Sequence, residues 1–222
     1  MKSKITITLI ITTIIAAVVG LVCLVAFQPV PYAGLDPDTV VAPVKETGFI
    51  GEKVIGDPAS AAVVVYEYAD YGCSHCAEWN RKVDTLMAKY PNKIALVFRG
   101  YDIGQFKNSR RVAAAVTAAA MQGYFKEYKD LVYANQAEWA YADGAELTAL
   151  LAQYFERAAA GSGDLTKFQD DIKSDAVKAR LRFEQAMGEK VGISGTPTFR
   201  IDGAKIDLAT LLDTIEQKLA TQ

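Results

Sequence analysis

The chain has 222 residues, of which 51% are hydrophobic and 23% charged, enough to bury the core of one sizeable domain or two small ones. Its formal net charge is −2, and without Lys2 and Lys4 the remaining 22 basic and 26 acidic residues give −4. A mildly acidic body is a poor partner for phosphate backbones, so the composition argues against nucleic-acid binding.

The N-terminal segment is the first predicted element. Residues 5–27 carry no charge and would span roughly 35 Å as a helix, enough to cross a bilayer. Residues 1–4 hold two lysines, and the next basic residue is Lys45, an asymmetry that keeps the N-terminus cytoplasmic. We therefore expect a single-pass anchor over 5–27, with the rest of the chain outside the cell membrane. A cleaved signal peptide is the alternative, although its apolar core usually runs to about 15 residues.

The next segments predict a spacer followed by a βαβ unit. Residues 28–50 contain four prolines and no periodicity, which indicates an extended extracytoplasmic spacer. "AAVVVYEY" (61–68) is a β-branched and aromatic run, typical of a strand in a sheet covered on both faces. "CAEWNRKVDTLMAKY" (76–90) has apolar residues at helical spacing, and "KIALVFRG" (93–100) predicts a second strand.

The remainder predicts a helical block and then a return to the sheet. Four helices are expected, over 109–122, 123–136, 144–158 and 174–191. "PTFRIDGAKI" (197–206) predicts a hairpin about an Asp-Gly turn. "DLATLLDTIEQKLA" (207–220) predicts a closing helix capped by Asp207. The fold class is therefore α/β, with a sheet whose middle is interrupted by helices.

Two of the three cysteines and the only histidine lie together in "DYGCSHCAEW" (70–79). A structural zinc site needs four Cys or His ligands, and beyond residue 27 the chain has three, within four positions. A structural disulfide between Cys73 and Cys76 would enclose two residues and restrain little, because the gain grows with loop length. A redox-active thiol pair is the interpretation that remains.

Redox chemistry has a physical basis in this segment. If a helix begins at or just after Cys73, its sulfur lies near unpaired backbone N–H groups and the positive end of the helix dipole. Both stabilise a thiolate, and an imidazolium at His75 would add to them. A stabilised thiolate favours the reduced pair, so the oxidised pair accepts electrons from other thiols. The alternative is that His75 is an exposed polar residue without a role in the chemistry.

The segment "EYADYGCSHC" resembles the active site of the DsbA-like thiol:disulfide oxidoreductases, which are thioredoxin-fold proteins with a helical insertion. Ser74 stands where the commonest version of the motif has proline. "GISGTPTFRIDG" resembles the cis-proline loop of that family, and "AAAVTAAAMQGYFKEYKDLVYANQAEW" resembles its first inserted helices. The resemblance implies a thioredoxin-like domain over 51–220, with an α-helical insertion at about 105–190.

The resemblance also implies roles for matched positions. Cys73 would be the exposed nucleophile and Cys76 the buried resolving thiol, with His75 tuning Cys73. Pro197 would follow a cis peptide bond and lie against the disulfide, and the Thr196 backbone would pair with an extended substrate segment. An ordinary turn proline at 197 is the alternative.

Glu67 matches a buried acidic position of the family, where it would relay a proton to or from Cys76. A carboxylate on an apolar strand costs several kcal/mol unless it is partnered or protonated. A place at the solvated rim of the sheet is the alternative for Glu67.

The implied function is donation of the Cys73–Cys76 disulfide to unfolded exported proteins with free thiols. No cofactor besides the cysteine pair is expected, the protein would be a monomer, and a membrane partner linked to quinone would reoxidise it. A disulfide reductase or isomerase is the nearest alternative. A non-catalytic peptide-binding chaperone on a thioredoxin fold is the alternative from another class.

Overall fold

The computed structural model describes residues 34–44 and 49–221. The predicted anchor over 5–27 therefore lies outside the described residues, as does the segment 1–4. In the part of the chain that is described, no helix is both long and apolar enough to cross a membrane. The predicted localisation, a single-pass membrane protein with an extracytoplasmic catalytic domain, is corrected on this finding.

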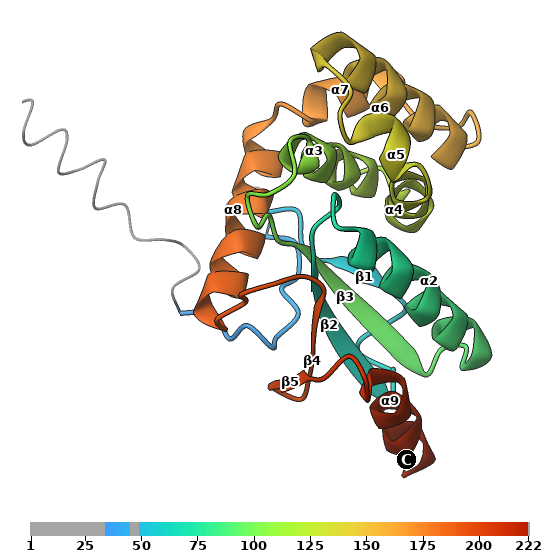
Figure 1. The fold of residues 1–222 in the computed structure, drawn as a ribbon, viewed down its shortest axis with the longest axis vertical. Helices are drawn as coiled ribbons and strands as arrows, with labels where there is room; N and C mark the ends of the chain where they lie inside the picture. The colour runs from blue at the N-terminus through green and yellow to red at the C-terminus, as the bar shows by residue number, and fades with distance from the viewer. Residues whose placement is uncertain (1–33, 45–48, 222) are drawn as a thin grey trace, which may run out of the picture. The chain divides into compact units, whose positions relative to one another are not determined.

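Five strands form one mixed sheet in the order β1-β3-β2-β4-β5 (Figure 1). They are β1 (Lys53–Ile55), β2 (Val63–Ala69), β3 (Ile94–Gly100), β4 (Thr198–Ile201) and β5 (Ala204–Ile206). β2 and β3 are parallel, and the other neighbouring pairs are antiparallel. Helix α2 (Ser74–Lys89) joins the two parallel strands, which confirms the predicted βαβ unit. The predicted hairpin is also present, because Asp202 and Gly203 both have positive φ and turn β4 into β5.

One face of the sheet is covered by α2 and α9 (Leu211–Ala220). Because side chains alternate along a strand, Val65, Leu96 and Phe199 point to the same face, where they are buried against Trp79 and Leu211. α9 begins at Leu211 with Thr210 as its N-cap, whereas the sequence predicted a cap three residues earlier, at Asp207. The predicted cap, Asp207, instead lies in the preceding turn, where its carboxylate accepts the backbone N–H of Ala209 at 2.8 Å.

The insertion is helical, as predicted. Its helices are α3 (Ser109–Ala120), α4 (Phe125–Ala134), α5 (Gln136–Trp139), α6 (Gly144–Ala158), α7 (Leu165–Asp171) and α8 (Asp175–Lys190). α3 to α7 gather beyond the carboxyl ends of β2 and β3, while α8 returns along the sheet (Figure 1). A second apolar core holds them together, with Trp139 fully buried and Phe155 stacked on Phe168 at 4.2 Å between ring centroids.

A network of buried charges joins β1 and β3 to α8. Arg99 pairs with Glu52 at 2.7 Å, and Arg180 pairs with both Glu52 at 3.1 Å and Glu184 at 2.9 Å. The Lys53 ammonium reaches Glu184 at 2.6 Å. All five side chains are buried, so each charge depends on its partners to offset the loss of hydration.

Residues 36–44 differ from the predicted spacer because they pack on this domain. The guanidinium of Arg200 binds the carboxylate of Asp38 at 2.9 and 3.0 Å, and the Tyr66 hydroxyl donates to the Asp38 carbonyl at 2.7 Å. Arg99 donates to the carbonyls of Pro37 and Thr39. Residues 36–44 are therefore tied to the sheet by side chains of β2, β3 and β4.

Candidate active site

The turn between β2 and α2 is organised by Asp70. Its carboxylate accepts the backbone N–H of Gly72 at 2.9 Å and of Ile103 at 3.1 Å, and it accepts the hydroxyl of Ser109. The Asp70 carbonyl also accepts the backbone N–H of Cys73 at 3.1 Å. Burial raises the pKa of Asp70, and the bond from Ser109 opposes that rise. One buried carboxylate thus fixes the backbone that presents the first cysteine.

Two further features hold this turn. A Cβ at Gly72 would lie 2.4 Å from the Cβ of Phe106, so only glycine fits where the turn meets the loop before α3. The amide of Gln136 in α5 donates to the carbonyls of Tyr71 at 2.6 Å and Cys73 at 3.0 Å. The helical insertion therefore binds the active-site turn directly.

Cys73 is the N-cap of α2, which places its sulfur at the helix start as predicted. Its backbone is extended, and its side chain makes no capping hydrogen bond. The backbone N–H groups of the first turn of α2 therefore have no capping oxygen and lie near the sulfur. The residue is only 7% exposed, so the prediction of an exposed nucleophile is wrong for the free thiol: the loop with Thr196 covers most of Cys73. Its Sγ donates to the carbonyl of Thr196 at 3.4 Å, which brings together positions 123 residues apart.

The pKa of the Cys73 thiol is lowered to about 6, mainly by a hydrogen bond from the Cys76 thiol. Partial burial opposes this shift, while the backbone N–H groups of Cys76 and His75 support it. Cys73 is therefore largely a thiolate at neutral pH and is suited both to nucleophilic attack and to departure from a mixed disulfide.

Cys76 has the opposite environment. It is fully buried one turn into α2, and both cysteines are free thiols. Burial raises its pKa well above the ordinary value, and the neighbouring Cys73 and then Glu67 add to that rise. Cys76 therefore holds its proton where Cys73 has lost it.

Glu67 lies on β2 beneath the cysteines and is fully buried, which excludes the solvated rim that was its alternative. Neither carboxylate oxygen has a hydrogen-bond partner among the described residues. Burial raises its pKa to about 8, and the positive charge of Lys129 opposes this rise. At neutral pH Glu67 is therefore mainly a neutral acid that holds a proton near Cys76.

Lys129 enters this interior from α4 and is itself fully buried. Its ammonium donates to the side-chain carbonyl of Asn80 and pairs with Asp130 at 3.0 Å. Lys126, which is partly exposed, then pairs with Asp130 at 2.6 Å and with Asp84 at 3.2 Å. A polar chain thus runs from the buried lysine to the surface between α2 and α4.

The loop before β4 faces the cysteines. The peptide bond between Thr196 and Pro197 is cis, as the resemblance implies, and Pro197 is buried. Thr196 is half-buried, and neither its hydroxyl nor its backbone N–H has a partner among the described residues. An unpaired backbone N–H beside a reactive sulfur is a position where an extended peptide can add a hydrogen bond.

His75 points away from the sulfurs. Its side chain is 77% exposed, and its Nδ1 lies 4.0 Å from the carboxylate of Glu78. The contribution of His75 to the lowered pKa of Cys73 comes from its backbone N–H.

The site contains four residues that sequence reasoning did not assign: Asp70, Ser109, Lys129 and Gln136. Asp70 lies inside the quoted active-site segment, but its spacing carries no sign of the turn it organises. The other three come from the helical insertion, where single polar residues look like ordinary solvent-facing positions. No cluster of three or more potential metal ligands occurs in the ranges that the structure covers.

The chain was compared with known proteins. A family model described as Thioredoxin matches residues 50–219, which is 170 of the 222 residues. The curated relatives include the Na(+)/H(+) antiporter NhaA 3 of Salinispora tropica, 32% identical over 149 residues, and the antiporter NhaA of Herminiimonas arsenicoxydans, 29% identical over 153. The matches cover 67% and 68% of this chain, but the chain spans only about a fifth of the length of these relatives, 21% and 22%.

Solved structures give the fold. A thioredoxin-like oxidoreductase from Silicibacter pomeroyi is 26% identical, with a TM-score of 0.58 over 76% of this chain and 92% of that one. BdbD from Bacillus subtilis is 18% identical, with a TM-score of 0.65 over 82% and 99%. MdbA, a thiol-disulfide oxidoreductase from Corynebacterium diphtheriae, is 21% identical, with a TM-score of 0.60 over 85% and 98%. The chain therefore belongs to the thioredoxin family and has the DsbA-like fold that its motifs indicate.

Proposed function

We propose that the protein is a thiol-disulfide oxidoreductase that donates its Cys73–Cys76 disulfide to unfolded exported proteins with free thiols. The observation that carries this proposal is the difference between the two thiols, one with a pKa lowered to about 6 and the other buried with a raised pKa. Such a pair stabilises the reduced form through the Cys73 thiolate, so its oxidised form gives up the disulfide readily.

The reaction proceeds in two exchanges. A client thiolate attacks Cys73 Sγ, a mixed disulfide forms, and the bond to Cys76 breaks. The sulfur of Cys76 leaves with the bonding electron pair and takes a proton, for which buried Glu67 is the donor. A second client thiolate then attacks the client sulfur of the mixed disulfide, and Cys73 leaves as a stabilised thiolate. The client has lost two electrons and the cysteine pair has gained them.

The surrounding residues position these steps. The Thr196 backbone N–H, beside the cis peptide at Pro197, pairs with the extended client segment. His75 tunes Cys73 through its backbone N–H. Glu67 regains its proton by way of the polar chain that starts at Lys129. The protein acts as a monomer, and a membrane partner that passes electrons to quinone reoxidises the pair, as the family resemblance implies.

The test is transfer of the disulfide to a reduced, unfolded model client with one cysteine pair, followed by mass spectrometry. We expect one client disulfide per reduced Cys73–Cys76 pair, and none with Cys73→Ser. Equilibration with glutathione measures the reduction potential of the Cys73–Cys76 pair and so tests the direction of the reaction. A potential of about −120 mV supports an oxidase, and one of about −270 mV supports a reductase. A Cys73→Ser variant that still suppresses client aggregation as well as the wild type would favour the chaperone.

A further inference from the structure

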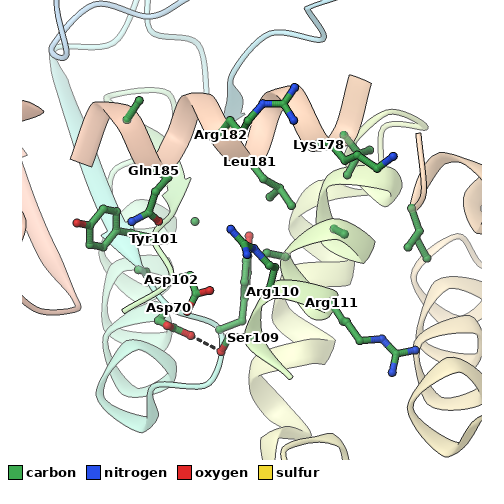
Figure 2. A pocket seen from close by; sticks show the side chains of 18 of the residues that line it. Asp70, Tyr101, Asp102, Ser109, Arg110, Arg111, Lys178, Leu181, Arg182 and Gln185 are labelled. Carbon is green, nitrogen blue, oxygen red and sulfur yellow. Dashed lines mark hydrogen bonds between the residues drawn. The ribbon is translucent and has the colours of Figure 1, made fainter. Parts of the chain in front are cut away.

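A cavity of about 740 Å³ lies between α3 and α8, beside the carboxyl end of β3 (Figure 2). We call it the α3/α8 cleft. Neither cysteine lines it, so it is separate from the redox pair. Its volume falls within the range of about 300–1,000 Å³ that small-molecule sites occupy.

The interior of the cleft is apolar. Ala113 and Ala114 of α3 face Val177 and Leu181 of α8, and the two alanines leave the space open. Larger side chains at these positions would fill the gap between two packed helices. The apolar walls fit the body of an aliphatic or aromatic compound.

The rim of the cleft is basic. Five cations and three carboxylates line it: Lys107, Arg110, Arg111, Lys178 and Arg182, with Asp70, Asp102 and Glu189. The difference is a formal charge of +2. In Figure 2 the Arg110 side chain extends from α3 into the space below Leu181.

One of these cations is available to a ligand. Within residues 34–44 and 49–221, neither Arg110 nor Arg182 has a hydrogen-bond or ion-pair partner. Figure 2 shows that Arg110 extends toward the cleft, whereas Arg182 lies on the other side of α8. The other cations are engaged: Arg111 with Gly144 and Thr148, Lys107 with Tyr141, and Lys178 with Asp175. The carboxylates are occupied by local donors: Asp70 by Ser109, Asp102 by the Gly104 N–H at 2.8 Å, and Glu189 by Gln185 at 3.4 Å.

We propose that the α3/α8 cleft binds a small organic anion, with its acidic group on Arg110 and its apolar body against the alanine wall. The free guanidinium group selects negative charge, since it forms charge-assisted bonds with carboxylates and sulfonates. This site does not depend on the proposed redox function.

The test uses fluorescence titration of the full chain with 8-anilino-1-naphthalenesulfonate, whose aromatic body carries one sulfonate. N-phenyl-1-naphthylamine, which has the same body without charge, is the matched neutral probe. We expect the sulfonate to bind the wild type more tightly than the neutral probe. The variant Arg110→Gln should weaken the sulfonate roughly tenfold and leave the neutral probe unchanged.

Two controls make the result decisive. Arg157→Gln removes the same charge from α6, outside the cleft, and should leave both probes unchanged. Ala113→Leu fills the wall and should weaken both probes, with circular dichroism to verify that the variant is folded. Equal affinity for the two probes, an equal effect of Arg157→Gln, unchanged binding by folded Ala113→Leu, or no binding of the sulfonate by the wild type would each overturn the proposal.

Discussion

Cys73 and Cys76 are separated by less than one turn of α2, and the regions around them differ in every respect that controls a proton. Around Cys73 the protein supplies hydrogen-bond donors: the Cys76 thiol and the backbone N–H groups at the helix start. Around Cys76 it supplies a buried acid, Glu67, and the buried phenol of Tyr133, whose oxygen has no partner among the described residues. The first region stabilises negative charge and the second excludes it.

The comparison teaches that a difference of three positions along a helix gives two identical side chains opposite surroundings. The N-cap side chain lies beside unpaired N–H groups, whereas a side chain three residues later turns toward the sheet, where it loses water. The inner region then needs a proton donor, because a thiolate leaving from Cys76 is not stabilised there.

Removing either sulfur should have the largest effect, because the difference between the two cysteines then disappears. Cys73→Ser should abolish mixed-disulfide formation, because the buried Cys76 is neither accessible nor ionised. In Cys76→Ser the Cys73 thiolate should still attack a client disulfide and accumulate a mixed disulfide that cannot be resolved within the protein. Non-reducing electrophoresis measures both variants with a client whose single cysteine is activated as its disulfide with 2-nitro-5-thiobenzoate, which leaves as the free thiolate. A mixed disulfide trapped at Cys76 in Cys73→Ser would contradict the assignment.

Glu67→Gln should change how stability depends on pH. The pKa of Glu67 is raised in the folded protein from an ordinary 4.5 to about 8, so its proton is held more tightly than in the unfolded chain. Its contribution to stability is present below pH 4.5 and is lost as the pH rises through 8. The total loss, complete once the pH exceeds 8, is on the order of 5 kcal/mol.

Denaturant unfolding of the oxidised forms, in which the thiols do not titrate, measures this effect. The difference in unfolding free energy between Glu67→Gln and the wild type should grow from pH 4.5 to 8 in favour of the variant. A difference that stays constant over that range would show that Glu67 is ionised throughout.

Cys76→Ala should raise the pKa of Cys73, because it removes the hydrogen bond that contributes most to the lowered value of about 6. The pH dependence of iodoacetamide alkylation reports the thiolate, so its midpoint should move upward by about one unit or more. Cys76→Ser, which keeps a donor, is the matched control and should move the midpoint less. If the midpoint did not move in Cys76→Ala, the backbone N–H groups at the start of α2 would account for the lowered pKa of Cys73 without the Cys76 thiol.

His75→Gln should have the smallest effect on Cys73. The imidazole is 77% exposed, and charges in water interact weakly across several ångströms. We expect the alkylation midpoint to rise by less than about 0.5 unit, since the backbone N–H of residue 75 is retained. A rise as large as that in Cys76→Ala would mean that the imidazolium approaches the sulfur in solution.

The sequence predicts the redox pair well because its signals are local. Two cysteines at i and i+3 after a β-branched run place the first sulfur at a helix start, and the structure has Cys73 at that position. The cis peptide bond before Pro197 could be predicted only from the resemblance to the family motif, since no local sequence pattern distinguishes it from an ordinary turn proline.

What the sequence did not predict depends on long-range packing. β1 has three residues and α5 has four, too few for a hydrophobic period to show. Lys129 lies on an amphipathic helix, where a lysine normally faces water, and its burial arises only because α4 packs over Glu67. Gln136 acts on a turn 63 residues away.

The buried charge network has a practical consequence for anyone shortening this chain. Glu52 neutralises Arg99 and Arg180, and it lies just two positions inside the region that the family match covers. A version starting at residue 53 would leave Arg99 buried without its counter-ion and Arg180 paired with Glu184 alone, a change that typically costs several kcal/mol. Since Arg99 also binds the carbonyls of Pro37 and Thr39, recombinant production should keep every residue from 36 onward.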